Sequence, residues 1–306
     1  MFLIHVKAKE RQNKTLRKHQ WVVIEIYFLI PAIITLAGIT MYPVAYGVIM
    51  SFRDLISGKL IFVGLANYGR LIAGGRFAHS LYITMVFTIV AVIVETILGM
   101  LIALLYSDDK IAGIFVLRVL LVLPMIVIPI VVAMVFRHLI YEPKMGVLNY
   151  FFDLIRLPML KSKWSCDIKT ALLSLILIDI WERTPFPFLV FLAGIKSLPK
   201  EPHEAALIDG ASPWQTFFYV TLPLLRHIIM VVIVFRAIGC IKAFDIFYGV
   251  TAGGPGVATE NVSMYIYYQM FKYNRVGTAS ASTVITMLIT FCFVFFIYKA
   301  ILGKES

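Results

Sequence analysis

The chain has 306 residues, of which 60% are hydrophobic and only 15% charged, and its mean hydropathy is +0.89. A soluble domain has roughly half apolar and a quarter charged residues, so this composition indicates a polytopic membrane protein. The net charge of +11 could indicate nucleic-acid binding. However, the Lys and Arg residues lie at the edges of apolar runs and do not cluster with aromatic residues, so basic flanks of membrane helices explain the charge more simply.

Several chemical classes are not expected from the motifs. The three cysteines show no CxxC spacing, and the six histidines show no HExxH pairing. A disulfide framework, a zinc site and a metalloprotease are therefore not expected. The chain also has no GxxxxGK[ST] phosphate loop, so we expect it to hydrolyse no ATP itself and to hold no metal or cofactor.

Residues 1–20 form a basic tail that includes "KAKERQNKTLRK". The apolar run that follows is about thirty residues long, too long for the core of a signal peptide, and predicts a first transmembrane helix. A membrane helix needs roughly 20 apolar residues to cross about 30 Å of hydrocarbon. Six such runs occur: Trp21–Met50, Leu81–Tyr106, Ile111–Phe136, Thr170–Ile195, Leu224–Tyr248 and Ala279–Leu302.

Prolines interrupt three of these predicted spans, namely the first, the third and the fourth. Neighbouring helices can satisfy the backbone groups that such prolines free. The kinks fit either helices that surround a transport path or ordinary bends without a role. Between the spans, short interfacial helices are expected in Ser51–Ser80 and Arg137–Lys169, and "TAGGPG" predicts a turn after the fifth span.

Charge bias predicts the orientation. The tail carries six Lys or Arg residues, and placing it in the cytoplasm gives 14 basic residues inside against 12 outside. The first helix usually dominates the topology, so we expect an inner-membrane protein with both termini in the cytoplasm. After four crossings, the loop between the fourth and fifth spans lies in the cytoplasm too.

This cytoplasmic loop contains "HEAALIDGASPWQTFFYVTLP". A short helix is predicted up to Asp209, and the Asp209-Gly210 turn ends it. Ser212, Pro213 and Gln215 then fit a capping box with proline at the first helical position, which predicts a second short helix. The small residues Ala205, Ala206, Gly210 and Ala211 allow close approach of another backbone, and Glu204 and Asp209 add carboxylates. From the residues alone the element is either a structured connector or a docking element.

The spacing of Glu204-Ala205-Ala206, Gly210, Val220 and Leu222-Pro223 resembles the "EAA" signature of membrane subunits of binding-protein-dependent ABC importers. Val220 replaces the usual isoleucine, and Pro202 stands where a large residue is common. "AGIKSLPKE", "TLPLLR", "TAGGPGVATE" and "LRVLLVLPMIVIPIVVAMVFRHLI" also resemble the family in the correct order. The resemblance covers roughly residue 24 to the C-terminus and is closest to the maltose-type branch for sugars and polyols.

The resemblance implies an all-α type I permease fold with six transmembrane helices and a cytoplasmic two-helix coupling loop. It implies two ATP-binding partner subunits that use ATP and Mg²⁺, a second homologous permease, an external solute-binding protein and the lipid membrane as partners. The implied coupling residues are Glu204, Ala205, Ala206, Asp209, Gly210 and Pro223. The corresponding domain boundaries are a tail 1–20, a first helix and external loop 21–80, a core 81–302 that includes the loop 197–223, and a C-terminus 303–306.

Ionisable residues inside the predicted spans are costly and therefore candidates for function. They fall in the second span (Glu95), the fourth and the fifth. They either neutralise one another or form a polar wall of a solute path. The maltose-type resemblance favours the wall, built from Asp179, Trp181, Glu182, Arg183, Phe186, Arg236, Gly239, Cys240 and Ala243. Lys242 and Asp245, spaced i, i+3, are interpreted as a structural pair.

The competing hypothesis is an ion-coupled carrier or channel that works without ATPase subunits, which the intramembrane charges would also fit. A membrane-embedded enzyme has no support, because the chain shows no nucleophile–base or metal-binding pattern. The sequence does not identify the solute.

Overall fold

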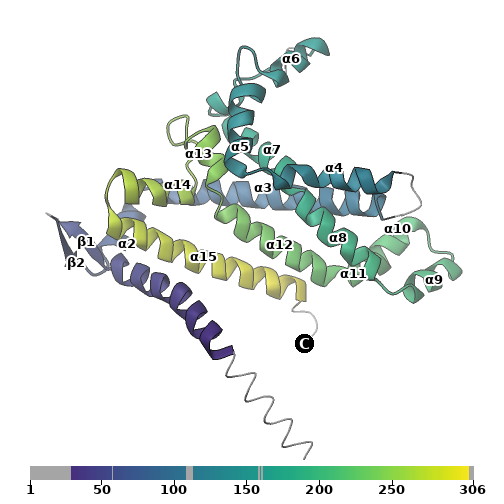
Figure 1. Ribbon diagram of the computed structural model, residues 1–306, viewed down its shortest axis with the longest axis horizontal. Helices are drawn as coiled ribbons and strands as arrows, with labels where there is room; N and C mark the ends of the chain where they lie inside the picture. Colours follow the sequence, from purple (N-terminus) through teal and green to yellow (C-terminus); the bar gives the residue numbers. More distant parts are fainter. Residues whose placement is uncertain (1–28, 57, 108–112, 158, 160, 303–306) are drawn as a thin grey trace, which may run out of the picture.

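The computed structural model describes residues 29–302, apart from 57, 108–112, 158 and 160. The basic tail, the start of the first predicted span and the last four residues lie outside the described part. The structure is an elongated helical bundle in which α3 (Arg76–Leu105), α12 (Arg226–Ile241) and α15 (Val276–Leu302) run side by side (Figure 1). Apolar helices of this length satisfy their own backbone groups, as lipid demands.

The bundle is built around α3, which packs against α7 (Ala171–Arg183), α8 (Pro185–Ser197) and α12. It packs most extensively against α8, where a Cβ added at Gly99 would lie 2.7 Å from the Cβ of Pro187. Because real Cβ atoms essentially never come so close, only glycine permits this contact. The helix crossing therefore depends on one residue without a side chain.

In the described part of the chain, three helices are long and apolar enough to cross a membrane: Leu29–Ser51, α3 and the segment Val276–Ala300 of α15. Two bent pairs bring this number to five if each pair counts as one span: residues 114–140 and residues 213–241. The fourth predicted span corresponds to α7 and α8, which follow each other across Thr184. Asp179, Glu182 and Arg183 make that stretch less apolar than the others.

The third predicted span, Ile111–Phe136, is not one straight helix. It divides into α4 (Ile114–Ile126) and α5 (Pro129–Val135), which are bent by 91° to each other. Ile128 precedes Pro129 and has an extended backbone, as the steric clash with the proline ring requires. Beyond α5 follow the π-helical turn η1 (Phe136–Ile140) and α6 (Val147–Leu154), which projects from the bundle (Figure 1).

The fifth predicted span, Leu224–Tyr248, is also divided. Helix α12 ends at Ile241, and α13 (Asp245–Val250) begins after a three-residue break. Helix α13 packs on α5, and a Cβ added at Gly249 would lie 2.6 Å from that of Ala133. The chain continues through α14 (Val262–Tyr267) and the π-helical turn η5 (Tyr268–Lys272) into α15.

The segment after the first helix holds a β-hairpin that the sequence interpretation missed. Strands β1 (Arg53–Ile56) and β2 (Lys59–Phe62) pair antiparallel through a turn that includes Gly58, whose φ is +78°. The expected short helix is present as α2 (Ala66–Ala73). Asn67 anchors the hairpin by donating its amide to the carbonyls of Ser51 and Arg53, at 2.8 Å each.

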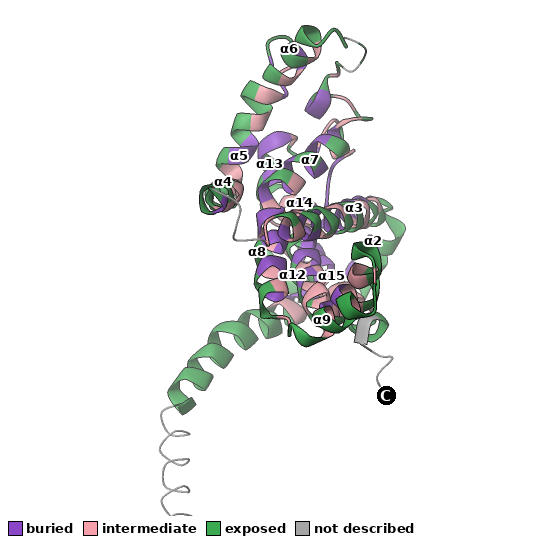
Figure 2. Ribbon diagram, turned by 90° about the vertical axis from the view of Figure 1, so that its right-hand side faces the viewer, coloured by how far each residue is buried: buried purple, intermediate pink, exposed green. Residues whose placement is uncertain are grey.

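The two ends of the bundle differ. One end carries β1, β2 and α2, and the opposite end carries α9 (Glu201–Ile208), α10 (Pro213–Thr216) and α11 (Leu222–Leu224), with the π-helical turn η4 (Phe217–Thr221) between the last two (Figure 1). The end of α3 and the start of α4 lie at the α9 end as well. The helix Leu29–Ser51 lies apart from the bundle and is exposed almost throughout (Figure 2).

Candidate functional site: the α9–α11 loop and a buried charge cluster

The predicted two-helix loop is present at one end of the bundle. Helix α9 ends at Ile208, and Gly210 reverses the chain with a φ of +73° and no atom within 4 Å of the position of a Cβ. Ser212 and Gln215 form the predicted capping box, with Pro213 at the first turn of α10. The two arms are joined where His203 Nε2 lies 3.1 Å from Thr221 Oγ1. The loop is thus a closed and internally braced element.

The loop is also anchored in the membrane bundle. Leu225, which directly follows α11, is fully buried among Phe188 and Phe191 of α8 and Met100 of α3. Phe217 packs against the same cluster. A displacement of the loop therefore acts on α3 and α8, because close-packed side chains transmit strain rather than absorb it.

The outer surface of the loop exposes large apolar side chains. Ile208 is 86% exposed, Tyr219 80% and Trp214 72%, and Leu207 and Phe218 are exposed as well. The predicted coupling residues Glu204, Ala205, Asp209, Gly210 and Pro223 are exposed, and Ala206 is half-buried. Large exposed apolar side chains on one short element favour an interaction site. Sequence reasoning named the small and acidic residues and missed these large ones, because the side chains that α9 leaves exposed depend on how the loop folds.

A second group of residues forms a buried charge cluster where α3, α7 and α12 meet. Arg236 of α12 makes a bidentate pair with Glu95 of α3, in which Nη2 donates to Oε1 at 2.9 Å. The same Nη2 donates to Asp179 Oδ2 of α7 at 2.8 Å, and Cys240 Sγ lies 3.4 Å from it. All four side chains are buried. Of the two alternatives for these charges, mutual neutralisation or a polar wall, this arrangement corresponds to mutual neutralisation. It also joins three helices.

Glu182 lies apart from this network although it is fully buried. Its only ionic partner among the described residues is Arg183, at 2.9 Å and in a geometry that makes no hydrogen bond. Both of its carboxylate oxygens thus lack a hydrogen-bond donor in the described part of the chain. A buried carboxylate without donors is costly, so Glu182 is the member of the predicted solute path that is most open to a further partner.

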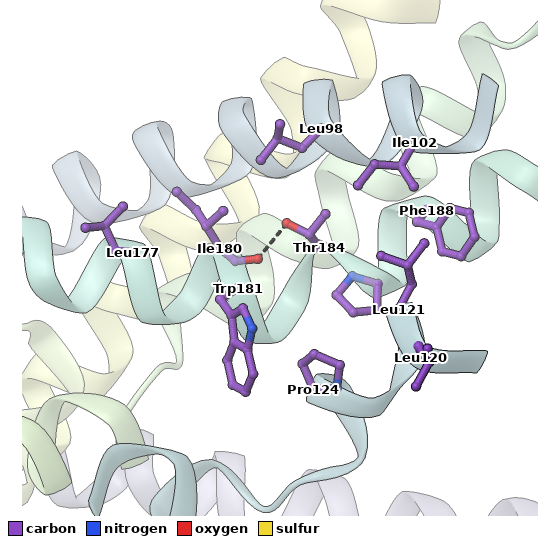
Figure 3. Close-up of a pocket in the computed structure, with 11 residues that line it drawn as sticks. Leu98, Ile102, Leu120, Leu121, Pro124, Leu177, Ile180, Trp181, Thr184 and Phe188 are labelled. Carbon is purple, nitrogen blue, oxygen red and sulfur yellow. Dashed lines mark hydrogen bonds between the residues drawn. The ribbon is translucent and has the colours of Figure 1, made fainter. Parts of the chain in front are cut away.

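The remaining predicted path residues do not form one wall. Phe186 packs near Phe235, with ring centroids 6.4 Å apart, and Gly239 is exposed beside Arg236. The carbonyl of Ala243 accepts a hydrogen bond from Asn261. Trp181 lines an apolar cavity of about 450 Å³ between α3, α4, α7 and α8 (Figure 3).

The interpretation of Lys242 and Asp245 as a structural pair is wrong. Both side chains are exposed, and neither forms an ion pair in the described part of the chain. The physical reason is the break after Ile241: Lys242 caps α12 and Asp245 opens α13, so the two residues do not share one helix face. Among the described residues no group of His, Cys, Asp and Glu could hold a metal ion.

A helical bundle with a braced loop at one end and charges buried between its spans defines a membrane transport subunit. Residues 95–305 match the family described as binding-protein-dependent transport system inner membrane component, and the chain belongs to this family. The family assignment confirms the predicted resemblance and the multi-pass membrane location.

Curated relatives share about a third of their residues with this chain. The trehalose/maltose transport system permease protein of Thermococcus litoralis is 35% identical, over 76% of this chain and 77% of the relative. The arabinooligosaccharides transport system permease protein of Halalkalibacterium halodurans is 32% identical, over 87% of this chain and 84% of the relative. Neither relative is described as an ion-coupled carrier.

Solved structures share the fold. A chain of a bacterial ABC transporter involved in the import of the acidic polysaccharide alginate superposes with a TM-score of 0.79 at 22% identity. The alignment covers 94% of this chain and 98% of that one. The predicted all-α permease fold is confirmed by this match, with the β1–β2 hairpin as a small addition.

Proposed function

We propose that this chain is the sugar-translocating permease subunit of an ATP-driven importer and that the loop Glu204–Pro223 docks on an ATPase subunit. Sugar as the solute class is supported by the names of the relatives, which include trehalose/maltose and arabinooligosaccharide systems. Coupling through the loop is supported by one observation above all. The loop is rigid and anchored in the bundle, yet its outer surface exposes five large apolar side chains.

The partners follow from this role. Two ATP-binding subunits would bind ATP and Mg²⁺, since this chain has no phosphate loop. A second homologous permease would complete the translocation path, and an external solute-binding protein would deliver the sugar. The α9 end would face the cytoplasm, together with both termini.

The mechanism needs a lever that moves as a unit. Closure of the ATPases on ATP would shift the loop, and Leu225 and Phe217 would pass this displacement to α8 and α3. The charge cluster would keep α3, α7 and α12 together while the translocation path changes from inward-facing to outward-facing. Such switches occur between discrete packed arrangements and not by continuous deformation.

Copurification tests the docking. The tagged chain should retain a nucleotide-binding subunit on an affinity column, and Ile208→Glu should abolish this retention, since a charge replaces an apolar contact. Ile72→Glu is the matched control, because Ile72 is 80% exposed on α2 at the opposite end. Retention of the ATPase by Ile208→Glu, or its equal loss in both variants, would contradict the docking surface.

A further inference from the structure

A second cavity is lined by residues of α5, η1, α13 and η5. Its volume is about 480 Å³, within the range of about 300–1,000 Å³ that small-molecule sites occupy. Helices α5 and α13 lie away from the α9 end of the bundle (Figure 1). In the orientation predicted from charge, this is the external side of the membrane. None of the residues predicted for the coupling loop or the solute path lines it.

Aromatic rings dominate the wall of this cavity. Tyr267 lies 5.7 Å from Tyr248 and 5.2 Å from Phe271, measured between ring centroids, and Tyr268 also lines the cavity. The exposed fraction is 41% for Tyr248 and 75% for Phe271. These rings are neighbours, yet part of their surface is left uncovered by the described residues. Rings of this kind supply large contact areas at little cost in conformational entropy.

Polar groups without partners accompany the rings. Neither the Tyr248 hydroxyl nor the Tyr267 hydroxyl makes a hydrogen bond to any described residue. Arg137 donates one N–H to the carbonyl of Gly249 at 3.2 Å, and its other donors have no partner in the described part of the chain. Lys272 lies over the Tyr268 ring, 5.1 Å from its centroid.

Ring faces flanked by hydroxyl and guanidinium groups match the chemistry of a sugar. The C–H face of a pyranose packs on an aromatic ring, and its hydroxyls accept from arginine and exchange hydrogen bonds with phenols. We propose that this cavity is an external reception site for one sugar unit, with Tyr248 and Tyr267 as the stacking platform and Arg137 as the hydrogen-bond donor. This proposal rests on the sugar-importer function and adds a binding step that precedes entry into the membrane path.

The geometry also explains how the site is positioned. Gly249 allows α13 to pack closely on Ala133 of α5. Tyr248 of α13 and Arg137 of η1, which continues α5, therefore lie on facing elements. On the other side, the Tyr268 hydroxyl donates to the carbonyl of Ala252 at 2.9 Å and fixes η5 against the turn after α13. Both walls are held in place before any sugar arrives.

The test measures sugar binding directly. The purified membrane complex, with its ATPase subunits and without the solute-binding protein, is applied in nanodiscs to a printed array of neutral and acidic oligosaccharides. We expect retention on at least one saccharide, and a loss of about fivefold to tenfold in affinity for Tyr248→Ala and for Tyr267→Ala. Tyr248→Phe keeps the ring and should lose less.

Two further variants separate the explanations. Tyr82→Ala removes a tyrosine that is 64% exposed on α3 and does not line this cavity, so its binding should be unchanged. Equal losses of sugar affinity in Tyr82→Ala and Tyr248→Ala would show that the rings anchor the protein in the lipid interface, and would overturn the proposal. An array on which no saccharide retains the complex would overturn it too. Gly210→Asp should bind sugar normally, so that a failure of coupling is distinguished from a failure of this site.

Discussion

The α9–α11 loop and the Glu95–Asp179–Arg236 cluster differ in which side chains find partners within the chain. In the cluster, one guanidinium satisfies two carboxylates from two other helices, and all three side chains are buried. In the loop, backbone and capping groups are satisfied internally, whereas the large apolar side chains are left exposed. The cluster, whose charged groups are paired within the chain, holds the helices together. The loop, whose large apolar side chains stay exposed, needs a partner that covers them.

The largest expected effect is that of Arg236→Ala. It leaves two buried carboxylates without a counter-charge, which costs about 3–5 kcal/mol in buried pairs of known proteins. We expect a strongly reduced yield of folded subunit and a lower melting temperature in detergent. Glu95→Gln combined with Arg236→Gln removes both charges of the main pair and should recover part of the yield. Normal stability of Arg236→Ala would show that the cluster does not hold the helices.

Asp179→Ala should act on transport more than on stability. The bidentate pair between Arg236 and Glu95 still joins α12 to α3, and α7 still packs against α3, so we expect the subunit to assemble. One charge-assisted hydrogen bond is lost, which costs about 1.5–3 kcal/mol of stability. Because a polar group of the predicted solute path is lost as well, we expect sugar uptake to fall by about tenfold. Uptake by proteoliposomes and the yield of the assembled complex are measured together. If Asp179→Ala destroys assembly, the residue is structural and the solute path loses it.

The smallest effect is expected for Ser212→Ala, which removes the cap of α10. Loss of such a cap costs about 1 kcal/mol. Amide hydrogen exchange of residues 213–216 should become faster, and the sugar-stimulated ATPase activity should fall by a few-fold at most. Ser212→Asp preserves a capping oxygen and should restore the protection. Unchanged exchange in Ser212→Ala would show that the loop does not depend on its capping box.

Local patterns in the sequence were sufficient for the loop. The capping box of Ser212 and Gln215, the turn at Gly210 and the spacing to Pro223 are all short-range signals, and the structure has each of them. The same holds for the long apolar helices, whose composition alone indicates the membrane. Short-range chemistry decides where such elements begin and end.

The tertiary arrangement could not be predicted from local sequence patterns in the same way. Nothing in the periodicity shows that Pro129 would turn α5 by 91° or that the fifth span would break after Ile241. Those breaks explain why Lys242 and Asp245 do not pair. Arg236 and its partner Glu95 lie 141 positions apart in the sequence. Only the packing of α3 against α12 brings them together.

The proposed role of the α9–α11 loop is to transmit force to the membrane helices, and Gly210→Asp tests this role. A side chain at a φ of +73° strains the turn, and the added carboxylate lies on the docking surface. Gly113→Asp is the matched control, since Gly113 has a φ of +75° and is equally open but lies outside the loop. ATP-dependent sugar uptake is measured in proteoliposomes containing equal amounts of each complex. We expect Gly210→Asp to insert fully and show no uptake, and Gly113→Asp to show nearly normal uptake. Normal uptake by Gly210→Asp would contradict a role of the loop in coupling.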